Sequence, residues 1–216
     1  MKKCAAVEYI KDQFSKKSSS YHHGNLKEEL INQAIEIIHY DGIDTLTLSV
    51  LSKRLGTSRS AIYRHFSSKD ELIQNVLLYG FEILDQIITP ILMQKDKNVE
   101  QRLYLMGKSY IKFAQDNPNL YRMLFGEKYY DLREDICTVI DEKFSNAFNA
   151  LVSLLEEGQR LKDFKEQEPI LQALTVHANI HGMSSLYIDG HLNIRDNIDE
   201  LFEVSFKNLI DGLHFK

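Results

Sequence analysis

Residues 47–66 read TLSVLSKRLGTSRSAIYRHF, and this stretch decides the fold of the region around it. Thr47 and Ser58 are good N-cap residues, and each begins an apolar pattern of about eight residues with helical spacing. Gly56 lies between the two patterns, where a sharp turn requires the positive φ angle that glycine adopts easily. The sequence therefore predicts two short crossed helices joined by a turn, which is the helix-turn-helix motif.

The second of these helices is unusually polar on its outer side. Ala61, Ile62 and Phe66 are expected to pack inward. The outer side carries hydroxyl groups, guanidinium groups and rings, from Ser58, Arg59, Ser60, Tyr63, Arg64 and His65. Arginine reaches guanine edges or phosphates in the major groove, and hydroxyl groups reach phosphate oxygens. The pattern favours a helix that reads DNA, with a polar surface helix of a bundle as the alternative.

The rest of the chain is also patterned as helix. No segment alternates with period two for long, and the chain has only three prolines, so we expect an all-α fold of about nine helices. Ser68 and Glu71 have the spacing of a capping box, and Gly158 is expected to end its helix. Besides the two helices of the motif, the sequence predicts a helix that begins at Leu26 and ends before Gly42. Further helices are expected at about 69–89, 99–115, 118–125, 133–157, 169–189 and 196–213.

Length and composition exclude several classes of protein. The chain has 216 residues, with 44% hydrophobic and 26% charged residues, which excludes a wholly disordered chain, a collagen-like fibre and a membrane bundle. No run approaches the roughly 18 apolar residues of a transmembrane helix, and the N-terminus does not have the pattern of a secretory signal. The chain has two cysteines, Cys4 and Cys137, which are too few for a disulfide framework. We therefore expect a cytoplasmic protein.

The net charge of −5 is unevenly distributed along the chain. Residues 1–69 carry 11 Lys and Arg against 7 Asp and Glu, and the remainder carries 15 against 24. A basic N-terminal region on an acidic body indicates that the N-terminal region meets a polyanion, although a solvated charged face would give the same imbalance.

Residues 21–84 resemble the DNA-binding domain of the TetR/AcrR family of bacterial transcriptional regulators. The most specific match is AIYRHF-SSKDEL at residues 61–72, and the other matching residues are Ala34, Gly42, Thr47, Leu51, Gly56 and Ser58. YHHGNLKEEL at residues 21–30 resembles the start of one branch, which has a C-terminal domain named for a Trp-His-Gly signature. Here the corresponding residues are Ile180, His181 and Gly182.

The resemblance implies a role for each matching residue. Thr47, Tyr63 and Lys69 correspond to residues that hold phosphates, and His65 to a position near a phosphate at the end of the recognition helix. Ser58, Arg59, Ser60 and Arg64 correspond to positions that face bases and backbone. Ser49 stands where many members carry arginine, so one phosphate contact is expected to be lost.

The resemblance also implies how the chain is organised. We expect a flexible arm at residues 1–20, the DNA-binding domain at 21–84, and a ligand-binding and dimerisation domain at 85–216. One helix-turn-helix reads only a few base pairs, so such regulators bind as twofold dimers with half-sites about 34–36 Å apart or a multiple of that. The helices at 133–157 and 169–189 are the expected dimer surface, although burial within one chain would explain their apolar faces equally well.

The expected ligand pocket lies among the helices of the C-terminal domain. Its candidate residues are Tyr110, Phe113, Tyr121, Phe125, Phe148, His177 and His181, each of which could equally be an ordinary core residue. His177 and His181 have a spacing that could hold a metal, but without an obvious third ligand a polar pair is favoured.

The function expected from these features is that of a ligand-responsive regulator. No catalytic motif, cofactor site or metal site is expected. The favoured mode is a homodimeric repressor that occupies a near-palindromic operator and leaves it when a small-molecule effector binds. The alternatives are an activator of the same shape, and a helical small-molecule-binding protein without a DNA function.

Overall fold

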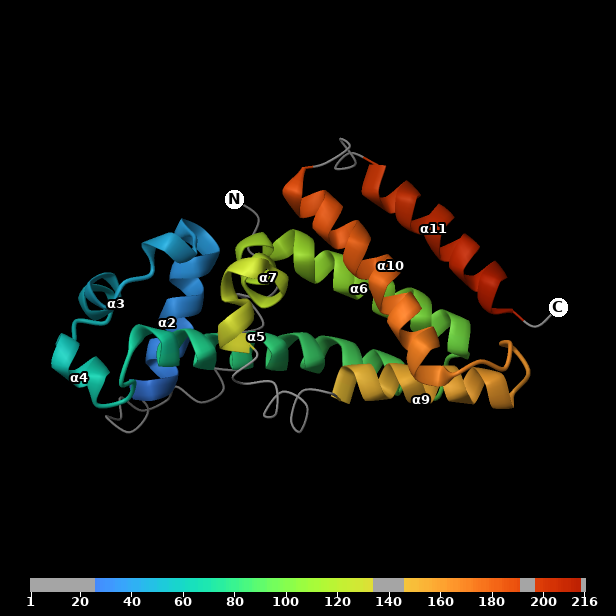
Figure 1. Cartoon of the computed structure of the whole chain (residues 1–216), viewed down its shortest axis with the longest axis horizontal. Coiled ribbons are helices and arrows are strands. Elements are labelled where there is room, and N and C mark those ends of the chain that lie inside the picture. Colours follow the sequence, from blue (N-terminus) through green and yellow to red (C-terminus); the bar gives the residue numbers. More distant parts are fainter. Residues whose placement is uncertain (1–25, 134–145, 191–196, 215–216) are drawn as a thin grey trace. The chain divides into compact units, whose positions relative to one another are not determined.

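A computed structural model describes residues 26–133, 146–190 and 197–214. Within these ranges the chain forms nine α-helices, two 3-10 turns and no strand, which confirms the predicted all-α fold (Figure 1). The helices are α2 (Leu26–Asp41), α3 (Leu48–Arg54), α4 (Arg59–Tyr63), α5 (Lys69–Leu92), α6 (Val99–Asp116), α7 (Pro118–Phe125), α9 (Asn146–Arg160), α10 (Pro169–Asp189) and α11 (Ile198–Leu213), with 3-10 turns η1 (Ile43–Thr45) and η2 (Glu127–Tyr129).

The described residues fall into two compact units. The first contains residues 26–83 and 116–133, and the second contains residues 84–115, 146–190 and 197–214. The arm expected at 1–20 and the first part of the helix expected at 133–157 lie outside the described residues. Helix α5 is continuous and contributes residues to both units.

The first unit is built on α2, which packs against both α3 and α7. Its core contains fully buried apolar side chains from α2, α3, α4 and α5, namely Leu30, Ile37, Leu51, Ile62 and Leu72. Asn119 of α7 donates from Nδ2 to the backbone oxygens of Ile38 and His39, at 3.1 and 3.2 Å. The Ile38 carbonyl also accepts from the Gly42 amide at 3.1 Å, so Asn119 adds a second donor at the end of α2. Helix α7 is thereby fastened to a helix about 80 residues earlier in the chain.

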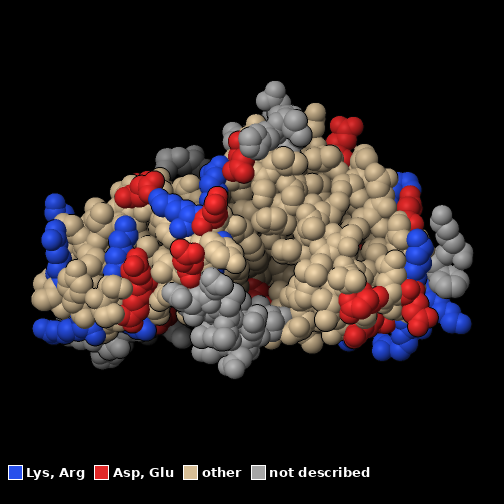
Figure 2. Space-filling view, viewed as in Figure 1, with Lys and Arg blue, Asp and Glu red and all other residues tan. Residues whose placement is uncertain are grey.

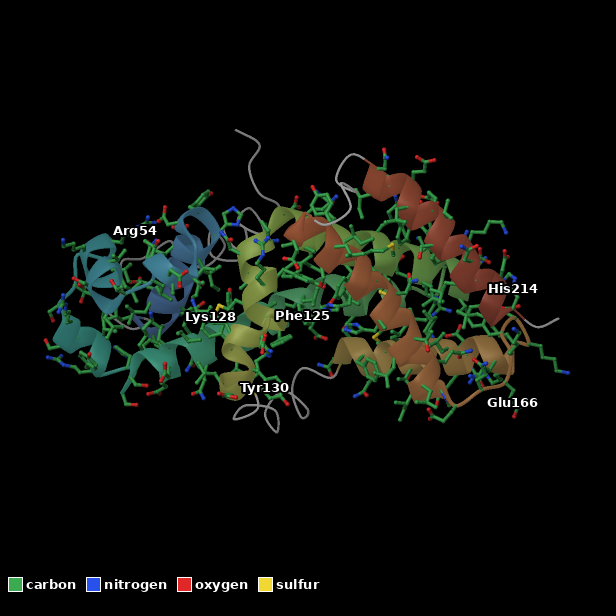
Figure 3. The ribbon with its side chains drawn as sticks, turned by 45° about the horizontal axis from the view of Figure 1, so that its top comes forward. Arg54, Phe125, Lys128, Tyr130, Glu166 and His214 are labelled. Atoms are coloured by element: carbon green, nitrogen blue, oxygen red, sulfur yellow. The ribbon has the colours of Figure 1, made fainter. Side chains whose placement is uncertain are left out.

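A second contact within the first unit involves the 3-10 turn η2, which follows α7. Lys128 of η2, labelled in Figure 3, forms an ion pair with Asp44 of η1. Gly80 of α5 lies against α7, where an added Cβ would stand 2.9 Å from Leu124 Cδ2. Glycine at this position therefore permits the close approach of the two helices.

The start of α5 differs in one detail from the expected capping box. Ser68 Oγ accepts from the Glu71 amide at 3.1 Å, as expected. The Glu71 carboxylate, however, accepts from the amide and the hydroxyl of Ser67, at 2.6 and 2.7 Å. These two hydrogen bonds stabilise the charged form and lower the pKa of Glu71. The first turn of α5 is thus tied to the residue that directly follows Phe66.

By length and composition, α5 is also the one described helix that could cross a membrane. Core helices of soluble proteins pass the same test. In the first unit, Leu72, Val76 and Leu77 of this helix are fully buried.

The second unit contains α6, α9, α10 and α11 together with the end of α5. Helix α10 packs against both α9 and α11. Arg102 of α6 is buried and donates from Nη2 to Glu157 of α9 at 2.5 Å and from Nη1 to the Leu92 carbonyl at 3.2 Å. This single guanidinium joins three segments of the chain, and it lowers the pKa of Glu157.

Gly158 does not end α9, as the sequence pattern suggested. The helix continues to Arg160, and Lys162 adopts the left-handed conformation, with φ 62°. Gly158 is buried beneath Phe164, where an added Cβ would lie 2.4 Å from the ring. The glycine is therefore required for close packing and not for a turn.

Candidate nucleic-acid interface

Hydroxyl groups cap both helices of the predicted helix-turn-helix. Thr47 is extended, and its Oγ1 accepts from the Val50 amide at 3.1 Å. Ser58 is also extended, and its Oγ accepts from the Ala61 amide at 3.1 Å. In both cases the hydroxyl acts as an acceptor toward the first turn of its helix.

The turn between the helices follows the predicted geometry. Gly56 has φ 60°, in the left-handed region that favours glycine. The Thr57 amide donates to the Ser52 carbonyl at 3.0 Å, which closes the end of α3. Helix α4 ends at Tyr63, three residues before Phe66, and is therefore shorter than the sequence pattern suggested.

Helix α4 has one buried side and one exposed side. Ile62 and Phe66 are almost fully buried. Tyr63 is 54% exposed, which is unusual for a large aromatic side chain. Of the other residues predicted to contact DNA, His65 is half-buried and the rest are exposed, namely Thr47, Ser58, Arg59, Ser60, Arg64 and Lys69. The structure thus brings the predicted set to the surface of one unit.

Two further hydrogen bonds link the polar groups of this surface. Arg59 Nη2 donates to Ser49 Oγ at 2.6 Å, and the hydroxyl groups of Ser58 and Ser60 lie 2.8 Å apart. Arg54 of α3, labelled in Figure 3, forms an ion pair with Asp41 at the end of α2. The charge of Arg54 is therefore partly compensated within the protein, whereas Arg59 has a neutral partner.

Two basic residues near this surface were not among the predicted contacts. Lys53 is exposed in the last turn of α3, and Lys27 in the first turn of α2 is exposed with Nζ 5.5 Å from the Phe66 ring centroid. At the α3–α4 end of the first unit, the outermost charged side chains in view are Lys and Arg (Figure 2). Lys53 could have been found from the polar side of the first helix pattern. Lys27 could not, because its proximity to Phe66 depends on the tertiary fold.

The residues predicted for a ligand pocket fall into separate groups. In the second unit, the rings of His177 and His181 stack at 5.8 Å, and Tyr110 meets His177 edge-on at 5.7 Å. Phe113 is buried in the same unit, and Phe148 is half-buried on α9. Tyr121 and Phe125 belong to the first unit, with ring centroids 4.7 Å apart.

Burial lowers the pKa of both His177 and His181, and the neighbouring His181 lowers that of His177 further. Two neutral imidazoles beside a phenol ring could bind a polar group. Among the described residues, no group of three or more His, Cys, Asp or Glu side chains could hold a metal ion.

An open hollow of about 710 Å³ lies elsewhere in the second unit. It is lined by Asp96, Lys97, Asn98, Glu100, Gln101, Tyr104, Leu105 and Phe206.

The fold and this surface define a helical DNA-binding protein with a helix-turn-helix and a separate helical domain, and comparisons with known proteins agree. Residues 30–76 match the domain family described as bacterial regulatory proteins, tetR family, and residues 103–209 match the tetracyclin repressor-like C-terminal domain. The chain belongs to the TetR family and is a DNA-binding transcriptional regulator. Membership of the Trp-His-Gly branch stays a prediction.

Individual relatives share less than 30% sequence identity with this chain in the comparisons below. The nucleoid occlusion factor SlmA of Vibrio cholerae is 29% identical over 152 residues, covering 69% of this chain and 77% of that protein. A protein of unknown function from Rhodococcus sp. RHA1 shares the fold with a TM-score of 0.74 and 23% identity, over 92% of this chain and 100% of that one. The regulator FadR from Bacillus subtilis, solved in complex with stearoyl-CoA, has a TM-score of 0.68 and 18% identity, over 87% and 100% of the two chains.

Tyr63→Ala should weaken binding to the cognate DNA without changing the fold, because the side chain is mostly exposed. If the hydroxyl donates to a phosphate, the loss is about 1 kcal/mol, or roughly fivefold in affinity. Fluorescence anisotropy titration measures the effect, and Tyr63→Phe isolates the hydroxyl from the ring. Unchanged affinity of both variants would show that this side of α4 does not face DNA.

The lowered pKa values of His177 and His181 predict a pH-dependent stability. Below the ordinary histidine pKa of about 6.5, the unfolded chain binds more protons than the folded one. The free energy of unfolding therefore has its full value above that pH and decreases as the pH falls and these residues become protonated. Urea unfolding at pH 7.5 and 5.5 should show a smaller difference for His177→Gln/His181→Gln than for the unaltered protein. His39, whose pKa is also lowered by burial, is common to both proteins. An equal difference in the two proteins would contradict the assignment.

Proposed function

We propose that the protein is a cytoplasmic repressor that binds a near-palindromic operator as a homodimer through α4, with no enzymatic activity. The observation that carries this proposal is the two-sided character of α4. Its apolar side is anchored in the core, and its outer side presents hydroxyl, guanidinium and phenol groups to solvent. Thr47, Ser58, Tyr63 and Lys69 supply phosphate contacts in this proposal, and Arg59 supplies a base contact.

The dimer contact that we propose lies on α10. This helix is apolar on two sides, since Val176 and Ile180 are buried within the second unit whereas Leu171 and Leu174 are 64% and 48% exposed. Ala178 and Gly182 continue the exposed side at helical spacing, and an added Cβ at Gly182 would meet no atom within 4 Å. An exposed apolar stripe of this kind is typical of a surface that another chain covers. Val204 of α11, 56% exposed, is a candidate for the same contact.

Replacing Leu171 and Leu174 with glutamate should convert the dimer to a monomer, because it places four carboxylates in a twofold contact. Sedimentation velocity measures the change. Leu161→Glu is the matched control, since Leu161 is equally exposed (56%) but lies beyond the end of α9. A double variant that sediments as the control does would place the dimer contact elsewhere.

The effector in this proposal is a small molecule that binds the second unit. Only a ligand with different affinities for the DNA-binding and released states can shift the protein between them. Tyr110, His177 and His181 are the residues we propose to contact its polar part. Because FadR from Bacillus subtilis was solved with stearoyl-CoA, long-chain acyl-CoA thioesters are the first class to test.

One experiment tests both parts of the proposed function. Genomic DNA fragments bound by the purified protein are sequenced, and the recovered sites are titrated with and without acyl-CoA. We expect a small number of near-palindromic sites next to promoters and weaker binding when the effector is present. Deleting the gene should raise expression of the adjacent genes, and lowered expression would indicate an activator.

A second candidate function follows from the similarity to nucleoid occlusion factors. A protein of that kind would bind many sites spread over the chromosome, away from promoters. The same sequencing experiment distinguishes the two functions by the number and position of the sites. Failure to recover any specific site would favour the remaining alternative, a helical binding protein without a DNA function.

A further inference from the structure

One hydrogen bond on the exposed surface of the first unit connects the two helices of the helix-turn-helix. Ser49 is the second residue of α3, and Arg59 is the first residue of α4. Arg59 Nη2 donates to Ser49 Oγ at 2.6 Å across a separation of ten residues. The bond lies on the same side of the motif as the residues predicted to meet DNA.

The backbone around Ser49 is held by hydrogen bonds in the first turn of α3. The N-terminus of α3 is capped by Thr47, whose Oγ1 accepts from Val50 at 3.1 Å. The Ser49 carbonyl accepts from Ser52 Oγ at 3.0 Å. These hydrogen bonds hold the backbone of Ser49 in the first turn of α3, and its hydroxyl there accepts from Arg59.

The Arg59 guanidinium retains its full charge at this position. Among the described residues, its hydrogen-bond partner is a neutral hydroxyl, and no carboxylate lies within ion-pair distance. Arg54 in the same motif is paired with Asp41 instead. Of these two arginines, Arg59 is therefore the one whose charge is not offset by a described carboxylate.

An exposed hydrogen bond of this kind adds little to folding, because water competes for both groups. Its effect is on the freedom of the arginine, which otherwise loses many rotamers when it binds. The guanidinium has five N–H donors in a planar fork, and the bond to Ser49 uses one of them. Two parallel donors remain for the O6 and N7 atoms of a guanine.

We propose that Ser49 is a positioning residue for DNA recognition, which holds the Arg59 guanidinium in the orientation that reads one base pair of each half-site. Ser49 sets this preference without contacting a base itself. Many family members carry arginine at position 49. In this proposal, the serine found here removes one phosphate contact and instead orients Arg59 toward a base. The inference rests on the proposed function, in that α4 must read DNA.

A double-mutant cycle tests the role of Ser49. The unaltered protein first selects its operator from a pool of random duplexes. Affinities are then measured by fluorescence anisotropy for that operator and for every single base-pair change in one half-site. The variants are Ser49→Ala, Arg59→Ala, the double variant, and Ser49→Thr, which keeps the hydroxyl.

Arg59→Ala should abolish the preference at one base pair, with a loss on the order of 10- to 100-fold for the cognate sequence. Ser49→Ala should weaken the preference at the same base pair by roughly 3- to 10-fold, and Ser49→Thr should retain it. In the Arg59→Ala background, Ser49→Ala should change neither affinity nor preference. Circular dichroism verifies that each variant is folded.

Two results would overturn the inference while leaving the proposed function intact. Ser49→Ala could weaken binding to every sequence equally and reduce its salt dependence, which would make Ser49 a phosphate contact. Alternatively, its effect could add to that of Arg59→Ala, or be absent, which would show that the two residues act independently. If the unaltered protein selects no sequence at all, the proposed function fails and this inference fails with it.

Discussion

The burial of Ile62 and Phe66 is the constraint on which DNA recognition by this protein depends. Helix α4 has only five residues, and a helix of that length is unstable on its own in water. It persists because Ile62 and Phe66 are almost fully buried and because Ser58 caps its first turn. The direction of every polar side chain on its outer side is therefore set by the core beneath it.

The start of α5 extends this constraint toward the second unit. Glu71 binds the amide and hydroxyl of Ser67, directly after the buried Phe66, so the end of the recognition region and the first turn of α5 are connected by hydrogen bonds. The same helix continues to Leu92, whose carbonyl accepts from the buried Arg102 in the second unit.

Features that depend on local chemistry could be predicted from the sequence, and features that depend on distant contacts could not. The caps at Thr47 and Ser58 and the positive φ of Gly56 follow from residue type and spacing over a few positions. The attachment of α7 to α2 through Asn119 has no such signal, because the two partners are about 80 residues apart.

Gly158 shows that prediction can also fail within a single helix, since a glycine that suggested a helix end instead permits close packing against Phe164. The hydrogen bond between Arg59 and Ser49 could not be predicted either, because it depends on the angle at which α3 and α4 cross. The spacing of apolar residues along the sequence does not specify that angle.

The distribution of charge in the first unit bears on how the proposed homodimer would bind DNA. Part of its positive charge is used internally, since Arg54 pairs with Asp41 and Lys128 with Asp44. The described basic residues of α2–α5 in this unit that lack a carboxylate within ion-pair distance are Lys27, Lys53, Arg59, Arg64 and Lys69. The electrostatic part of DNA affinity grows with the number of phosphates neutralised. A twofold dimer doubles that number and makes the second contact effectively intramolecular. In the homodimer proposed above, two such units at the correct spacing would supply this affinity together.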